Sequence, residues 1–247
     1  MKRQLLIGIH PVESALSRRP EQVQLLIVAR EARNRRVREL EELAQRLGVR
    51  VESRSRSVLD QDSDGQRHQD VMAEFEPNNI HSEKELEAVL AKIDQPTLVL
   101  VLDGVQDPHN LGACLRTADA AGVGLVVLPK DGAAGLTPTA RRSAAGAAEV
   151  MPVLLASNLA RVLRRLKEQG VWLAGTSDQA PQDIYQASLD GPLALVMGSE
   201  GKGMRRLTSE LCDFLVRIPM QGSVSSLNVS VATGVCLYEI NRQRSGS

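Results

Sequence analysis

The sequence contains few aromatic residues and few cysteines. Among its 247 residues are two phenylalanines, two tyrosines and one tryptophan, so we do not expect an aromatic platform that stacks bases, as in RRM domains. The three cysteines are far apart, form no CxxC pair and stand in apolar segments, where a thiol behaves as a small hydrophobic group. This pattern argues against a disulfide framework and favours a reducing compartment. The cysteines are Cys114, Cys212 and Cys236.

Metal-binding patterns and long apolar runs are also missing. The four histidines, at positions 10, 68, 81 and 109, show no metal-ligand spacing, and there is no HExxH motif. We therefore predict no metal site. The N-terminal apolar run, 5–8, is too short for the core of a signal peptide, and no run approaches a membrane span. We expect a cytoplasmic protein that has no membrane partner.

The charges of the chain balance, with 30 basic and 30 acidic residues. No global field attracts nucleic acid, so any such binding must come from local patches. The segment 30–56 is one such patch, because it holds nine arginines against five glutamates. This segment is either a solvated helical face or a contact surface, and the sequence leaves both interpretations open.

The hydrophobic pattern predicts two α/β domains joined by a linker. Residues 1–75 form a small α/β unit, residues 76–96 have the composition of a linker with a charged helical stretch, and residues 97–247 alternate apolar runs with helical patterns. Runs without polar alternation are typical of strands buried on both faces, so we expect a parallel sheet covered by helices. The predicted strands are 24–28, 49–52, 71–75, 98–102, 124–128, 150–154, 171–174, 193–197 and 214–218, and the predicted helices are 11–18, 33–47, 111–121, 138–147, 159–169 and 227–242.

Three segments in the second domain have unusual polarity. Segment 103–118, DGVQDPHNLGACLRTA, opens a predicted helix. Segment 195–204, LVMGSEGKGM, ends a buried strand in a glycine-rich turn that is neither a Walker loop nor GxGxxG. Segment 218–239, IPMQGSVSSLNVSVATGVCLYE, runs from a strand through a polar turn into the last helix. We expect the third segment to hold a cofactor.

Together these three segments resemble the motifs of the SPOUT superfamily. More narrowly, the chain is similar to the TrmH family of S-adenosylmethionine-dependent RNA 2′-O-ribose methyltransferases, and within it to the bacterial 23S rRNA guanosine 2′-O-methyltransferases. The resemblance implies a C-terminal trefoil knot, a homodimer, and methylation of a guanosine in the peptidyl-transferase region of 23S rRNA in a ribosome assembly intermediate. It implies RNA rather than DNA as the partner.

The N-terminal unit resembles the L30e-like RNA-binding domain of these enzymes. The similarity lies in the sequences GIHPV at 8–12 and SDGQRHQ at 63–69. Relatives usually have glycine after His-Gln, whereas this chain has Asp70, which calls the local turn geometry into question.

The resemblance assigns roles to individual residues. Arg116 matches the catalytic arginine of the family, and Asn110, six residues earlier and about two helical turns away, matches its orienting partner. An arginine side chain keeps its proton in nearly any protein site, so we expect Arg116 to stabilise charge on the ribose oxygen and the neighbouring phosphate rather than act as a base. The other catalytic candidates are Glu200, Ser226 and Asn228, and the cofactor-binding candidates are Gly198, Gly201, Ile218, Met220 and Leu227.

Each assignment has a structural alternative. Arg116 could form an ordinary surface ion pair, the turn 198–203 could need glycine only for its tight geometry, and Ser225 or Ser226 could simply cap the last helix. Two alternative functions also stay open: a tRNA 2′-O-methyltransferase of the same family, and a non-catalytic RNA-binding ribosome assembly factor.

Overall fold

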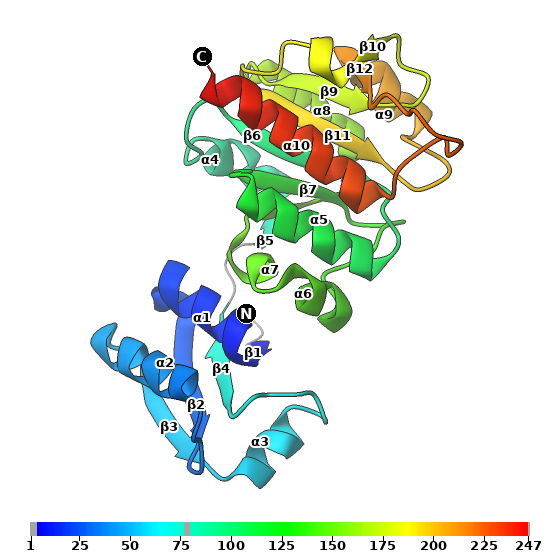
Figure 1. Ribbon diagram of the computed structural model, residues 1–247. Helices are drawn as coiled ribbons and strands as arrows, with labels where there is room; N and C mark the ends of the chain where they lie inside the picture. Colours follow the sequence, from blue (N-terminus) through cyan, green and yellow to red (C-terminus); the bar gives the residue numbers. More distant parts are fainter. Residues whose placement is uncertain (1–3, 77–79, 247) are drawn as a thin grey trace. The chain divides into compact units, whose positions relative to one another are not determined.

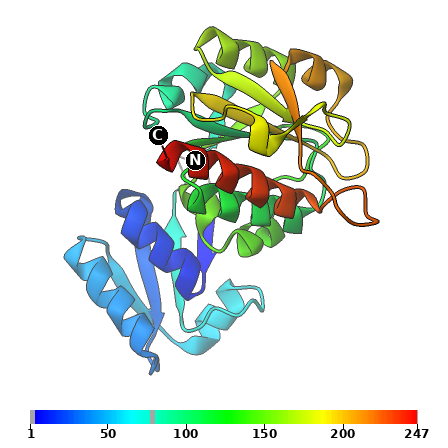
Figure 2. The same ribbon diagram turned by 45° about the horizontal axis from the view of Figure 1, so that its top comes forward.

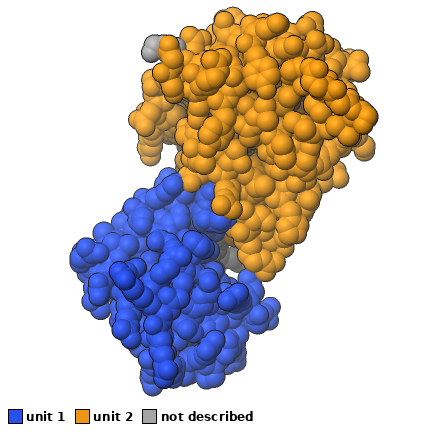
Figure 3. Space-filling model, viewed as in Figure 1, with its two compact units in different colours: residues 1–79, 145–150 blue, residues 80–144, 151–247 orange. Residues whose placement is uncertain are grey.

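A computed structural model describes residues 4–76 and 80–246 of the chain, which form two compact units (Figure 3). The first unit comprises residues 1–79 and 145–150, and the second comprises 80–144 and 151–247. Among the described residues, no helix has the length and apolar character that crossing a membrane requires.

The first unit contains a four-stranded sheet in the order β1-β4-β2-β3 (Figure 1). β4 pairs antiparallel with both β1 and β2, and β3 pairs parallel with β2. The predicted strands and the two predicted helices are confirmed, with the ends shifted by one or two residues. The elements are β1 (Gln4–Ile7), α1 (Ile9–Arg18), a 3-10 turn (Pro20–Gln22), β2 (Val23–Ala29), α2 (Arg35–Arg46), β3 (Val51–Arg54), α3 (Arg56–Asp62), β4 (Val71–Phe75) and α7 (Ala147–Val150).

Both faces of this small sheet are covered by helices. On one face, Val12 and Leu16 of α1 pack with Val37 and Leu40 of α2. On the other face, Leu59 of α3 packs against side chains of β2 and β4. Because Leu59 is the only buried residue of α3, that helix has no apolar periodicity, and this explains why the sequence did not predict it.

The turn before β4 adopts the backbone geometry that glycine favours. Asp70 has φ 65°, its backbone nitrogen donates to His68 Nδ1 at 3.0 Å, and its carbonyl accepts from the Ala29 nitrogen at 3.0 Å. These hydrogen bonds hold an L-residue in the left-handed region, where its Cβ is crowded.

We therefore expect Asp70→Gly to stabilise the first unit by about 0.5–1 kcal/mol. Relief of a left-handed conformation is worth about 1–2 kcal/mol, and the greater freedom of glycine in the unfolded chain removes part of that gain. Urea unfolding monitored by circular dichroism measures the change. Asp70→Ala is the matched control, because it removes the carboxylate but keeps Cβ and should give no gain. Equal stabilisation by both variants would show that the carboxylate, not the backbone, is responsible.

The second unit contains an eight-stranded sheet in which all the pairs are parallel, in the order β10-β12-β9-β11-β6-β7-β8-β5. The predicted parallel sheet is thereby confirmed. Its strands are β5 (Ile80–Ser82), β6 (Leu98–Asp103), β7 (Leu125–Pro129), β8 (Val153–Ala156), β9 (Trp172–Thr176), β10 (Gln182–Asp183), β11 (Leu193–Gly198) and β12 (Phe214–Arg217).

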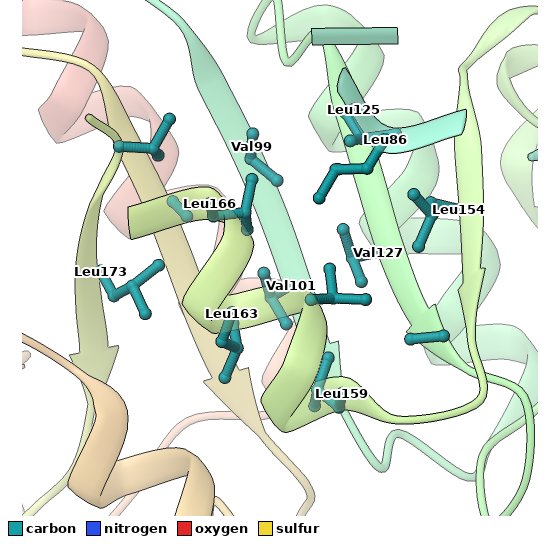
Figure 4. Packing of buried hydrophobic residues seen from close by; sticks show 14 of the residues in the cluster. Leu86, Val99, Val101, Leu125, Val127, Leu154, Leu159, Leu163, Leu166 and Leu173 are labelled. Atoms are coloured by element: carbon teal, nitrogen blue, oxygen red, sulfur yellow. The ribbon is translucent and has the colours of Figure 1, made fainter. Parts of the chain in front are cut away.

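Helices lie on both faces of this sheet (Figure 1 and Figure 2). On one face, α8 packs its leucines onto Val99 and Val101 of β6 and the neighbouring strands, as Figure 4 shows. α5 and α10 pack against each other on the opposite face. The helices and 3-10 turns are Glu83–Glu85, α4 (Leu86–Leu90), α5 (Pro108–Ala120), α6 (Pro138–Ala144), α8 (Leu159–Glu168), Ile184–Gln186, α9 (Arg206–Leu211) and α10 (Val229–Ser245).

Two elements near residue 146 differ from the prediction by more than a shift of their ends. The helix predicted over 138–147 is interrupted, because Ala145 and Gly146 have φ 50° and 98° and α6 ends at Ala144. The strand predicted to begin at Val150 begins at Val153, since Val150 is the last residue of α7. Left-handed backbone at the interruption is the physical cause of both differences.

Much of the segment predicted as a linker packs with the second unit. β5 adds to the edge of the sheet beside β8, and Leu86, Val89 and Leu90 are buried in the core. Glu83 fastens this segment to α8, because its carboxylate accepts from the Asn158 backbone nitrogen at 2.6 Å and from Arg161 Nε at 2.7 Å.

Two of the three cysteines, Cys114 and Cys236, are buried in this fold. Burial raises the pKa of the Cys114 thiol to about 11 and that of the Cys236 thiol to about 12. An unfolded thiol has a pKa near about 8.5, so the stability that comes from keeping these thiols neutral is complete below that pH. It is lost as the pH rises towards 11 to 12.

At pH 8.5 we therefore expect a thiol-specific disulfide reagent to leave Cys114 and Cys236 unmodified in the native protein and to modify both in urea. Mass spectrometry of the labelled peptides checks the result. Modification of Cys236 at the same rate in native and denatured protein would contradict its protection by burial.

The free energy of unfolding measured in urea should also fall between pH 8.5 and pH 10.

Candidate active site

Three polar side chains from distant parts of the chain meet at one end of the parallel sheet. Asn110 Nδ2 donates to Glu200 Oε1 at 2.9 Å, and Asn228 Nδ2 donates to the same oxygen at 2.7 Å. Asn228 Nδ2 also lies 3.1 Å from Asn110 Oδ1. One residue from each of the three predicted motifs thus enters a single network, which we call the Asn–Glu–Asn cluster.

The two asparagines are placed by the starts of helices. Asp107 caps α5 by accepting from the His109 nitrogen at 2.9 Å, which sets Asn110 in the first turn. Asn228 is itself the cap of α10, because its Oδ1 accepts from the Ser230 nitrogen at 2.9 Å. The alternative that Ser225 or Ser226 caps this helix is therefore wrong. Asn228 has two roles, because its side-chain oxygen caps the helix while its side-chain nitrogen donates within the cluster.

Glu200 stands on a turn that glycine makes possible. Gly198 ends β11, and Ser199 and Gly203 form a two-way backbone bridge, with N–O distances of 3.0 and 2.9 Å. A Cβ on Gly198 would lie 2.2 Å from the Gly203 carbonyl carbon and 2.3 Å from the Met204 nitrogen. The turn can fold back so tightly only because position 198 has no side chain. Gly201 and Gly203, with φ 75° and 66°, supply the left-handed geometry.

A pocket of about 430 Å³ opens beside the cluster. Its walls come from the carboxyl ends of β9, β11 and β12 and from the loop between β12 and α10. In parallel sheets this edge is where ligands bind, and the volume suits a small molecule. The lining residues are Thr176, Ser177, Asp178, Gln179, Met197, Gly198, Ser199, Glu200, Gly201, Lys202, Gly203, Met204, Ser209, Val216, Arg217, Ile218, Met220, Ser225, Ser226, Leu227, Val229 and Ala232.

The structure brings most of the predicted site residues to this place. All five cofactor-binding candidates line the pocket: Gly198, Gly201, Ile218, Met220 and Leu227. Among the catalytic candidates, Glu200 and Ser226 line the pocket, while Asn110 and Asn228 join Glu200 in the cluster.

Arg116 lies apart from the cluster. It is exposed on α5, and six residues of helix turn it about 120° away from Asn110 around the helix axis. The orienting contact expected from Asn110 is made to Glu200 and Asn228 instead. The structural alternative for Arg116 also finds no support, because no ion pair involves Arg116 among residues 4–76 and 80–246.

Sequence reasoning missed the parts of the pocket that come from β9 and β12. Thr176 ends β9 and donates from Oγ1 to the Val196 carbonyl at 3.2 Å, while Arg217 ends β12 and pairs with Asp183 at 2.6 Å. Both strands were predicted, so the rule that ligands bind at the carboxyl ends of parallel strands could have identified these residues. In the described part of the chain, no group of three or more His, Cys, Asp or Glu side chains could hold a metal ion.

Comparison with known proteins assigns both parts of the chain. Residues 97–238 match the model of the SpoU rRNA methylase family, and residues 5–81 match the model for RNA 2′-O ribose methyltransferase substrate binding. The 23S rRNA (guanosine-2′-O-)-methyltransferase RlmB of Pseudomonas aeruginosa is 54% identical over 237 residues, which cover 96% of this chain and 95% of that protein.

Solved structures show the same fold. An RNA 2′-O ribose methyltransferase is 29% identical to this chain with a TM-score of 0.77, over 98% of this chain and 89% of its own. The SpoU methyltransferase AviRb of Streptomyces viridochromogenes, in complex with AdoMet, has a TM-score of 0.78 at 24% identity and covers 99% of this chain and 92% of its own.

Proposed function

The chain belongs to the SpoU rRNA methylase family, and from this premise we propose that it transfers a methyl group from S-adenosylmethionine to the ribose 2′-oxygen of a guanosine in 23S rRNA. The observation that carries the proposal is the meeting of the three motifs: the Asn–Glu–Asn cluster lies at the rim of a pocket that contains every predicted cofactor-binding residue. The target guanosine in the peptidyl-transferase region is the finer part of the proposal.

The pocket residues fit S-adenosylmethionine. Ile218, Met220 and Leu227 offer an apolar surface for an adenine, and the glycines of the turn after β11 let the backbone approach the ligand. When bound, the cofactor would supply a methyl group on a sulfonium, which leaves as a neutral thioether without an acid, while the proton of the ribose hydroxyl passes to water. The protein therefore has to position the ribose and stabilise charge on its oxygen.

We assign the catalytic roles as follows. Asn110, Glu200 and Asn228 hold one another in a fixed geometry at the pocket rim, which pre-organises the site for the ribose. Ser226 faces the same pocket and adds a polar group near the reaction centre. Arg116 stabilises the negative charge that develops on the ribose oxygen and contacts the neighbouring phosphate.

We further propose that the active protein is a homodimer whose interface includes α10 and α5. Val231 and Tyr238 are seven residues apart and so lie on the same face of α10, the helix that packs against α5. Both side chains are apolar or aromatic, yet they are 51% and 56% exposed. A second copy of the chain would cover this face. Exposed Arg116 on α5 would then act on a cofactor bound by the partner, which accounts for its separation from the cluster.

Residues 1–75 serve in this proposal as the RNA substrate-binding domain, residues 76–96 as the connection and residues 97–247 as the catalytic domain with a trefoil knot. The match of residues 5–81 to a substrate-binding model supports the first assignment. A cytoplasmic location in a ribosome-producing cell follows from the substrate. The charged segment 30–56 belongs to this domain and is a candidate for its contact with RNA.

Mapping of ribose methylation by mass spectrometry tests the function. In 23S rRNA from cells without this gene, we expect one 2′-O-methylguanosine to be lost and to return when the wild-type gene is restored. An unchanged rRNA pattern would overturn the rRNA substrate. In that case, loss of a methylation in tRNA would identify the alternative substrate within the family, and failure to bind S-adenosylmethionine would favour the non-catalytic assembly factor.

A further inference from the structure

Asp103 is a fully buried carboxylate in the second unit. It ends β6, and its side chain is 0% exposed. A buried charge is unfavourable unless it is paired and hydrogen-bonded. Among residues 4–76 and 80–246, the partners of this carboxylate all belong to Arg205: the backbone nitrogen donates to Oδ2 at 2.9 Å, Nε donates to Oδ1 at 2.6 Å and a terminal nitrogen lies 2.5 Å from Oδ1.

This pair closes the loop that carries Glu200. At its start, Gly198 is the register partner of Asp103 where β11 lies beside β6. At its end, Arg205 precedes α9 and binds the same aspartate through both backbone and side chain. The loop 199–204 therefore leaves the sheet beside Asp103 and returns to Asp103.

Besides this pair, the loop is held by the hydrogen bonds of Glu200 to the two asparagines and by Met204, which packs against the core. Its residues are exposed except Ser199 and Met204, and two of its glycines have positive φ. Its internal fastening is the bridge between Ser199 and Gly203. Yet all six of these residues line the pocket, and Glu200 must also reach both asparagines of the cluster. The contacts of Arg205 with Asp103 at the end of this exposed, glycine-rich loop offset part of the entropy cost of ordering it.

We propose that Asp103 and Arg205 are positioning residues that hold the loop 199–204 closed, so that the pocket wall and Glu200 are in place before the cofactor binds. The inference rests on the function proposed above, but it makes a separate statement about the order of the loop. The pair acts through the loop and touches neither cofactor nor ribose.

Asp103→Asn tests this role, because the amide keeps the shape and can still accept from the Arg205 nitrogen but loses the charge. Arg205→Lys is a second variant. The Arg205 side chain is 58% exposed, so this substitution carries less risk to folding than a substitution of the buried Asp103. Glu83→Gln is the matched control: its carboxylate is also nearly buried, at 10% exposure, and pairs with Arg161 away from the loop.

Amide hydrogen exchange reads the loop directly. In both loop variants we expect exchange at Ser199 and Gly203 to rise about tenfold or more, and S-adenosylmethionine affinity, measured by calorimetry, to fall about tenfold. The control should lower the melting temperature and leave both quantities unchanged. The inference is overturned if Asp103→Asn and Arg205→Lys change only the melting temperature, as the control does.

The two proposals can fail independently. If the wild-type protein binds S-adenosylmethionine but methylates no 23S rRNA, the proposed substrate is wrong, while the exchange and affinity results still decide the role of Asp103. If rRNA methylation is confirmed and the loop variants match the control, the function stands and the positioning role is lost.

Discussion

Arg116→Ala should lower the rate of methyl transfer about 10²- to 10³-fold while S-adenosylmethionine affinity stays within about twofold. That range is typical of the loss of one charge partner of the transition state. The binding prediction follows from the structure, because Arg116 lies on α5 and is absent from the pocket lining of its own protomer. Single-turnover methylation of an rRNA fragment measures the rate, and calorimetry measures the affinity.

The matched control is Arg142→Ala, which removes an exposed arginine from the neighbouring helix α6. It should leave the single-turnover rate near that of the wild type. Near-normal turnover by Arg116→Ala would contradict the role given to Arg116. A proportionate loss in both variants would indicate a general effect of surface charge on RNA binding, an effect that weakens as the salt concentration rises.

Mixed dimers would test whether Arg116 acts across the proposed dimer interface. At a limiting cofactor concentration, Arg116→Ala and Gly198→Ala should each retain about 1% of wild-type activity or less, but a mixed dimer contains one intact pocket facing one intact arginine. Equal mixing and re-association give about half mixed dimers, each with one working site, so about a quarter of wild-type activity should return by this arithmetic. No recovery would place Arg116 in the site of its own chain.

Gly198→Ala should weaken S-adenosylmethionine binding about 10²-fold. The added Cβ would meet backbone atoms of Gly203 and Met204 at 2.2–2.3 Å, and backbone cannot rotate away as a side chain can. Overpacking of this kind costs about 1–3 kcal/mol, and the upper end corresponds to roughly 10² in affinity. The turn after β11 must open, which displaces Glu200 from the two asparagines. Calorimetric titration with the cofactor measures the loss.

Gly222→Ala is the control for this variant. Gly222 lies in the loop between β12 and α10, and a Cβ added there would meet no atom within 4 Å. It should bind the cofactor like the wild type. Circular dichroism and thermal unfolding establish that Gly198→Ala is folded. Wild-type affinity in a folded Gly198→Ala protein would show that the pocket does not depend on the tight turn.

The sequence predicted the sheet of the second unit well because its strands are buried on both faces. β6, β7 and β11 are apolar runs rich in Leu and Val without polar alternation, a pattern typical of strands buried between two layers of helices. α9 and β10 were not predicted, because they are short and largely polar and their position is set by tertiary contacts such as that between Arg205 and Asp103.

The sequence identified individual residues of the site but not the hydrogen bonds between them. The motifs identified Asn110, Glu200 and Asn228, yet nothing in their spacing indicates that both amides share one carboxylate oxygen. Which groups meet depends on strand order, where β11 lies between β6 and β9 although the three are far apart in the sequence. The cap of α10 was missed for a similar reason, since serine and asparagine are equally good caps and only the geometry selects Asn228.

The position of Asn228 has a consequence for the protein during its synthesis. A ribosome that has released residues 1–197 has delivered β6, β7 and β8, which pair with one another, yet it has delivered neither Glu200 nor the cap of α10. Domains fold as the chain emerges, N-terminal parts first. The nascent chain can therefore meet RNA through residues 5–81 before it has any means of methylating it. The Asn–Glu–Asn cluster can form only after Asn228 has emerged, so RNA contact precedes chemistry in the order of synthesis.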